Sequence, residues 1–425
     1  MLTGAAWIAI AIFITVYGLI VSEQVHRTKI ALMGAVVLLL VKIMPQEEAI
    51  AKIDFNTLGL LTGMMIVVAI AMRTGMFEYM AVLLAKKVKG NPRNIMTVFF
   101  LFTAVTSAML DNVTTVLLVT PIVFSITACL KTNPIPFLIS EILASNIGGT
   151  ATLIGDPPNI MIGGAVGLGF NEFIINLTPV VLVIGFVTNW LFLWIYRKEL
   201  VVSPEDQLCI MELDEKSYLE NPVLLKKVLG VLAVTIAGFV LHKALHLESA
   251  TVAMTGAATL LLISRIEPEE IFKELEWNTL FFFIGLFIVV GGLEATGVIR
   301  MIAEWGLSVT NSDIALLNYL ILWLSAIASA FIDNIPFVAT MIPLIKSMAE
   351  VGGLDVSTLW WALALGACLG GNGTIIGASA NVVVSSIAAG RGYPMTFVGY
   401  MKVAFPLMLV SIVISHIYIY LRYIM

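Results

Sequence analysis

Four carboxylic acids lie well inside long apolar segments of this 425-residue chain: Asp111, Glu141, Asp156 and Asp333. Removing a carboxylate from water is unfavourable unless it is paired, so such residues in apolar surroundings rarely lack a function. A carboxyl group can exchange a proton or bind a small cation. Asp also caps helix starts, but Asn would do so without a charge to bury, which favours a functional role for Asp111 and Asp333. For Glu141, near the end of its segment, a proton relay and a side chain that snorkels to water fit equally well.

Two glycine-rich stretches carry most of the other polar residues in these segments. Residues 145–159 combine Asn, Thr and paired glycines with Asp156-Pro157-Pro158, and residues 370–381 repeat much of this pattern. Glycines at this density break a helix, and unpaired backbone inside a membrane must be buried in protein or line a cavity. Close packing through small residues is the alternative, for which Asp-Pro-Pro is a poor choice. We therefore predict a site whose substrate- or ion-binding residues are Asp111, Asn112, Thr114, Asn146, Gly148, Gly149, Thr150, Thr152, Asp156, Asn159, Asp333, Asn334, Asn372, Thr374, Ser379 and Asn381.

The charges of these candidates restrict the solute. We expect proton coupling through Asp111, Asp156, Asp333 and Glu141. The candidates include no Lys or Arg, so a multiply anionic substrate would rely on helix N-termini alone. A cation or a neutral polyhydroxyl solute fits better. We expect no metal and no cofactor, with a proton or sodium as the coupling ion.

The composition places these segments in a membrane. Apolar residues make up 60% of the chain and charged residues 12%, and the mean hydropathy is +1.01. Too few polar residues remain to cover a water-facing globule. The net charge of −5, without a dense basic tract, makes nucleic acid an unsuitable partner. The three cysteines lie far apart in the sequence and suggest neither a disulfide framework nor a metal site.

The chain consists of one unit written twice, at a constant offset in sequence. Asp111-Asn112 corresponds to Asp333-Asn334, and Gly148-Gly149 to Gly370-Gly371, without a gap. Residues 1–196 and 223–425 are therefore predicted to be two repeats that fold alike. A polar cytoplasmic linker, residues 197–222, joins them.

Apolar length predicts five crossings in each repeat. A further apolar pair in each repeat, residues 93–130 and 313–346, is interrupted by Asp-Asn and is interpreted as a re-entrant hairpin; a pair of full crossings is the alternative. An odd number of crossings makes the repeats inverted. We thus expect an all-α polytopic membrane protein of two inverted repeats, each with five transmembrane helices and a hairpin, and broken helices at the midplane. The predicted spans are residues 3–22, 29–44, 56–72, 136–167 and 171–196, then 224–243, 250–264, 277–293, 357–389 and 394–421.

The basic residues predict an orientation in the plasma membrane. Most of the 23 Lys and Arg residues fall on one side if the amino terminus is outside. The positive-inside bias therefore places both termini outside and the linker in the cytoplasm.

The motifs resemble the ion transporter superfamily, in the group that contains arsenite-efflux permeases, NhaD-type sodium/proton antiporters and the P protein. The resemblance rests on residues 110–115 and 146–159 and spans nearly the whole chain. At the hairpin tips, Asp111-Asn112-Val113 and Asp333-Asn334-Ile335 stand where related dicarboxylate carriers have Ser-Asn-Thr, which disfavours citrate.

The resemblance and the residues together imply a secondary transporter rather than an enzyme. We expect proton-coupled efflux of arsenite or antimonite as the neutral hydroxide. The alternatives are a sodium/proton antiporter and an anion or carboxylate permease or channel of the same superfamily. The partners are then a small inorganic solute or ion and the lipid bilayer, and a homodimer or a cytoplasmic ATPase partner is compatible with the sequence.

Overall fold

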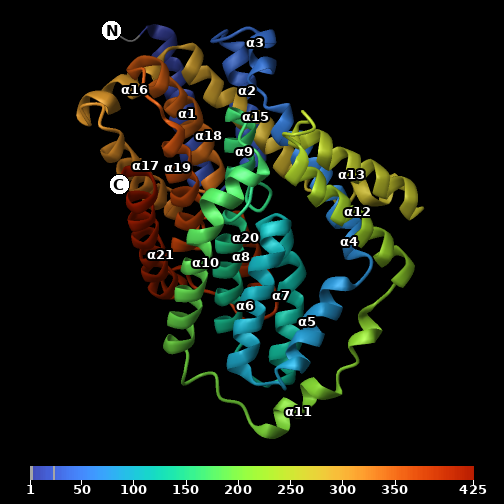
Figure 1. Ribbon diagram of the computed structural model, residues 1–425. Helices are drawn as coiled ribbons and strands as arrows, with labels where there is room; N and C mark the ends of the chain where they lie inside the picture. The colour runs from blue at the N-terminus through green and yellow to red at the C-terminus, as the bar shows by residue number, and fades with distance from the viewer. Residues whose placement is uncertain (1–2, 23) are drawn as a thin grey trace.

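The computed structural model describes residues 3–22 and 24–425, and the regular elements of that part are all helices (Figure 1). Nine of the described helices are long and apolar enough to cross a membrane. The first repeat contains α1 (Gly4–Ser22), α2 (Arg27–Leu40), α3 (Gln46–Ala51), α4 (Phe55–Met72), α5 (Met76–Lys87), α6 (Pro92–Met109), α7 (Asn112–Cys129), α8 (Ile135–Thr150), α9 (Pro157–Val166) and α10 (Phe170–Ile195). The linker contains α11 (Pro204–Glu212) and the short η1 (Glu215–Tyr218). The second repeat contains α12 (Pro222–Leu241), α13 (Ser249–Ser264), α14 (Pro268–Phe272), α15 (Trp277–Ala295), α16 (Val298–Val309), α17 (Ile314–Phe331), α18 (Asn334–Gly352), α19 (Ser357–Gly370), η2 (Gly371–Gly373), α20 (Ser379–Gly390), α21 (Phe397–Ile419) and η3 (Tyr420–Ile424).

Corresponding helices of the two repeats keep the offset seen in the sequence. Helices α6 and α17 begin and end at positions that this offset relates, and each is followed by the Asp-Asn pair that starts α7 or α18. The predicted breaks are also present, between α8 and α9 and between α19 and α20. At the first break, Pro157 and Pro158 start α9, where their missing N–H groups leave no helical bond unmade.

Helices α5 and α16 were not assigned from the sequence. Each is only 12 residues long, shorter than a full crossing, so apolar length gives no signal for it. Both follow a glycine with positive φ, Gly75 at 70° and Gly297 at 77°. The chain uses these two glycines to turn sharply from the third span into the helix that leads to the hairpin.

The helices form two groups. In one, α4 packs along α13 and α2 along α15, so each pair takes one helix from each repeat. In the other group, α6 packs on α8 and α17 packs on α19. These contacts place the hairpins beside the broken helices. Figure 1 shows α6 and α7 in the lower part of the molecule and α17 and α18 in the upper part. This arrangement is the one that inverted repeats would give, and its placement in a bilayer stays a prediction.

The linker is anchored to the first repeat by a disulfide, so the interpretation that the cysteines suggest no disulfide framework is wrong. Cys129 at the end of α7 forms a disulfide with Cys209 in α11, with Cα atoms 5.8 Å apart. Lys131 and Asp206 add an ion pair of 2.8 Å between the same two regions. The two cysteines are 80 residues apart in sequence, and they come close only because the linker folds back toward the end of α7.

Candidate functional site

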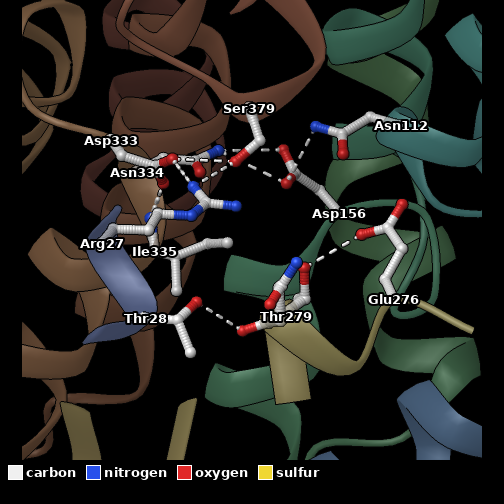
Figure 2. Close-up of polar contacts among 11 residues, drawn as sticks. Arg27, Thr28, Asn112, Asp156, Glu276, Thr279, Asp333, Asn334, Ile335 and Ser379 are labelled. Carbon is white, nitrogen blue, oxygen red and sulfur yellow. Dashed lines mark hydrogen bonds and ion pairs between the residues drawn. The ribbon is translucent and has the colours of Figure 1, made fainter. Parts of the chain in front are cut away.

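Asp156 lies at the junction of the two repeats. It is the residue before α9, yet its side chain makes no capping bond there. Instead, its carboxylate accepts hydrogen bonds from Nδ2 of Asn112 at 3.2 Å and from Nδ2 of Asn334 at 3.3 Å (Figure 2). Asp156 is 0% exposed. Both hairpin tips therefore meet on a single carboxylate.

A network of carboxamides extends from this carboxylate. The Nδ2 group of Asn112 also donates to Asn146 Oδ1 at 3.2 Å. Asn146 in turn donates to Asn372 and to Asn381, each at 2.9 Å. These side chains come from α7, α8, η2 and α20, so both breaks are joined to the hairpin by direct polar contacts.

The breaks are stabilised by one Asn each. Asn159 donates to the carbonyl of Thr152 at 2.8 Å, and Asn381 donates to the carbonyl of Thr374 at 2.8 Å. Each carboxamide replaces a backbone partner that the interrupted helix cannot supply, as buried backbone requires. The two repeats solve this problem in the same way.

The hairpin aspartates cap their helices and differ in their further partners. Asp111 accepts the backbone N–H of Thr114 at 2.8 Å and the hydroxyl of the same residue. Asp333 caps α18 and also accepts the hydroxyl of Ser379 at 2.8 Å. Capping alone therefore describes Asp111 in this structure but not Asp333.

Arg27 overturns the expectation of a site without Lys or Arg. Its Nη1 lies 2.5 Å from Asp333 Oδ2 and donates to Ser379 Oγ at 2.7 Å. Arg27 lies between the predicted spans 3–22 and 29–44, but the start of α2 reaches inward to the hairpin tip (Figure 2). The second half-site thus contains a fixed positive charge.

Glu141 does not snorkel. It is 3% exposed, accepts a hydrogen bond from Thr120 at 2.8 Å, and has one oxygen without a described partner. It lies on α8 one turn before Ser145, whose hydroxyl donates to the carbonyl of Asn112. The structure thus places Glu141 within the protein, near the Asp156 network but not in direct contact with that carboxylate.

Other predicted residues pack the helices. A Cβ atom at Gly148 would lie 2.1 Å from the carbonyl oxygen of Ala104, so the α6–α8 contact requires glycine. At Gly149 a Cβ atom would meet the backbone across the break. The hydroxyls of three predicted residues donate to backbone carbonyls: Thr150 to Asn146, Thr152 to Ala108 and Thr374 to Ala330.

Two cavities lie near the site, and different residues line each of them. The first, of about 480 Å³, is lined by Arg27, Asp333, Ser379, Glu276 and Thr279 among others. The second, of about 650 Å³, includes Asp54, Gly164 and Ala339, but its lining does not include the hairpin-tip carboxylates. Of these two cavities, only the first has a hairpin-tip carboxylate, Asp333, in its described lining, and we take it as the side toward which the site opens. We call the two cavities the Arg27 vestibule and the Asp54 vestibule.

The vestibules contain acidic residues that the sequence analysis missed. Glu276 accepts the hydroxyl of Thr279 at 2.9 Å, and Asp54 accepts that of Thr57 at 2.6 Å. These are equivalent positions in the two repeats. The offset already matched Thr57 with Thr279, so the acidic residue three positions before each was an available signal.

The arrangement defines a class of protein. A polar site at the junction of two repeats, built on broken helices and hairpin tips and open toward one side, is how secondary transporters bind a solute for alternating access. The same fold is found in a solved structure. The YdaH transporter of Alcanivorax borkumensis superposes over 98% of both chains with a TM-score of 0.60 at 12% identity.

Sequence comparisons give the family. Residues 17–366 match the citrate transporter (CitMHS) family. The 46 kDa membrane protein of Mycobacterium leprae is 41% identical over 98% of both chains. The human P protein is 35% identical over 97% of this chain and 59% of its own length. The chain belongs to the citrate transporter family, within the superfamily that the motifs indicated, and is a multi-pass membrane transporter.

Proposed function

We propose that this transporter moves its solute in exchange for protons and that Asp156 is the coupling residue. The observation that carries the proposal is the position of Asp156, a buried carboxylate held by the tips of both hairpins. Any movement that opens the site to the other side must rearrange these two contacts. A proton taken up or released at this carboxylate would therefore be linked to the direction in which the site opens.

For the solute we propose arsenite or antimonite as the neutral hydroxide. The carboxamides of Asn112, Asn146 and Asn334 and the hydroxyl of Ser379 offer uncharged hydrogen-bonding groups, which suit a small polyhydroxyl molecule. The positive charge of Arg27 is paired with Asp333, so it does not by itself require an anion.

Arg27 nevertheless favours a second candidate, a carboxylate permease. A guanidinium group binds carboxylates in a bidentate manner, and Arg27 lines the open vestibule. The family name points to the same class of solute. In this case an organic anion would displace Asp333 from Arg27.

Purified protein in acid-loaded liposomes, with a pH dye inside, tests these candidates. Arsenite, antimonite, sodium and citrate are added separately, and the interior pH is followed. A pH rise with arsenite or antimonite alone supports the first proposal if it is lost in Asp156→Asn but kept in Asp355→Asn, which changes an exposed carboxylate. A response to sodium alone indicates a sodium/proton antiporter, and a response to citrate alone indicates the carboxylate permease; either result overturns the arsenite proposal.

A further inference from the structure

Arg27 connects the two helix groups. It begins α2, which packs along α15, whereas Asp333 and Ser379 begin α18 and α20 in the group of hairpins and broken helices. A contact between these residues therefore joins parts of the molecule that must shift relative to one another if the site is to open on the other side.

The contact is a closed triangle of polar groups. Arg27 Nη1 reaches both Asp333 at 2.5 Å and Ser379 at 2.7 Å, and Ser379 donates to Asp333 at 2.8 Å (Figure 2). The guanidinium also lies over the ring of Phe282 on α15, 5.0 Å from its centroid. The side chains of Arg27 and Asp333 are only 28% and 12% exposed. Such a pair is screened less by solvent than a surface ion pair, and its rearrangement leaves partners unsatisfied.

The equivalent contact cannot form in the other repeat. The offset places Ser249 at the position of Arg27, and Asp111 at the position of Asp333. Among the ion pairs of the described residues, Asp111 takes part in none. Among the described residues, an ion pair with a basic side chain is therefore present at one hairpin tip only.

We propose that Arg27 acts as a built-in cation: its ion pair with Asp333 holds the site open toward the Arg27 vestibule. Opening toward the Asp54 vestibule requires this ion pair to break, and no equivalent pair replaces it on that side. Asp333 is thereby reserved for Arg27, and Asp111 and Asp156 are left for the transported species. The inference rests on alternating access by this transporter, and it does not depend on the solute.

Labelling of two equivalent positions tests the proposal. Leu117 lines the Arg27 vestibule and Ala339 lines the Asp54 vestibule. Cysteines are introduced singly as Leu117→Cys or Ala339→Cys in protein reconstituted in liposomes, and the rates of modification by a small soluble maleimide are compared. Cys129 and Cys209 are paired and Cys368 is buried, so protein without an introduced cysteine gives the background rate of labelling.

We expect Arg27→Ser, which copies the residue at position 249, to lower the Leu117-to-Ala339 rate ratio by about tenfold. Arg27→Lys keeps the positive charge and retains most of the ratio. Lys29→Ser, an exposed basic residue on the same helix, leaves it unchanged. An unchanged ratio in folded Arg27→Ser protein overturns the proposal.

Asp333→Asn supplies an independent check. It is expected to change the ratio as Arg27→Ser does, and the double variant is expected to change it no further, because both substitutions remove the same contact. Fully additive effects contradict the proposal. The labelling requires no solute, so a wrong assignment of the transported species would leave this result readable.

Discussion

The two repeats agree in backbone and differ in charge. Helices α6 and α17 have the same length and register, and Asn159 and Asn381 complete the two breaks with the same hydrogen bond. In contrast, three charged residues in or near the site have uncharged counterparts in the second repeat. The pairs are Arg27 and Ser249, Glu141 and Leu363, and Asp156 and Ala378. The paired geometry thus builds the framework of the site, and under the proposed function the single charges select what passes through it.

Among these three positions, substitution of Asp156 is expected to have the largest effect on transport. Asp156→Ala, which copies position 378, is expected to lower proton-coupled transport by about 100-fold or more, as for loss of other proton-transferring side chains. Initial rates in the liposome assay measure this effect. Asp355→Asn serves as the control, and near-normal coupling in the Ala variant would show that the charge at position 156 is dispensable.

The shared backbone geometry can be tested with equivalent glycines. A Cβ atom at Gly148 or Gly370 would lie 2.1 or 2.5 Å from a carbonyl oxygen of the adjoining helix. We expect Gly148→Ala and Gly370→Ala each to reduce the free energy of unfolding by about 1–3 kcal/mol through overpacking. Thermal unfolding in detergent measures this change. Gly18→Ala, in open space on α1, is the control. Destabilisation at only one of the two sites would break the equivalence of the repeats.

Glu141 tests whether a second charge of the first repeat takes part in coupling. Glu141→Gln keeps a partner for Thr120 but has no exchangeable proton, and we expect it to slow proton-coupled transport about tenfold while stability is kept. Glu141→Leu, which copies position 363, should be equally slow. Rates across a range of pH values measure the effect. Normal rates in both variants would assign Glu141 a structural role only.

The smallest expected effect concerns the linker, which an ion pair and a disulfide join to the first repeat. Lys131 lowers the pKa of Asp206 below its ordinary value of 3.8 through the ion pair between them. The contribution of this ion pair to the anchoring is therefore fully present above about pH 4 and is lost as the pH falls through the lowered value. Limited proteolysis of reduced protein at pH 7 and pH 3 should show a more accessible α11 at the lower pH. Asp206→Asn should reduce the difference, and a pH response of full size in this variant would exclude this ion pair as a cause.

Much of the fold could be predicted because spacing and apolar length are local signals. The constant offset between the repeats predicted that corresponding helices occur in both, and Asp156-Pro157-Pro158 predicted the first break. Arg27 was absent from the predicted site because its position relative to Asp333 depends on how α2 packs against a hairpin of the other repeat. The disulfide of Cys129 was missed for the same reason, since only the folded linker brings Cys209 close. The short helices α5 and α16 gave too weak an apolar signal.

The contact of one carboxylate with both hairpin tips has a consequence for the origin of the molecule. Asn112 and Asn334 hold equivalent positions in the sequence and approach Asp156 at nearly equal distances, so this carboxylate is shared by both hairpin tips. An assembly of two identical half-length chains would set two such carboxylates at this junction, where they would repel each other in a dry interior. Fusion of the halves into one polypeptide removes this constraint, since one copy can become Ala378. A duplicated gene can thus keep a symmetric framework and place a lone charge at its centre, which a symmetric dimer of identical halves cannot do.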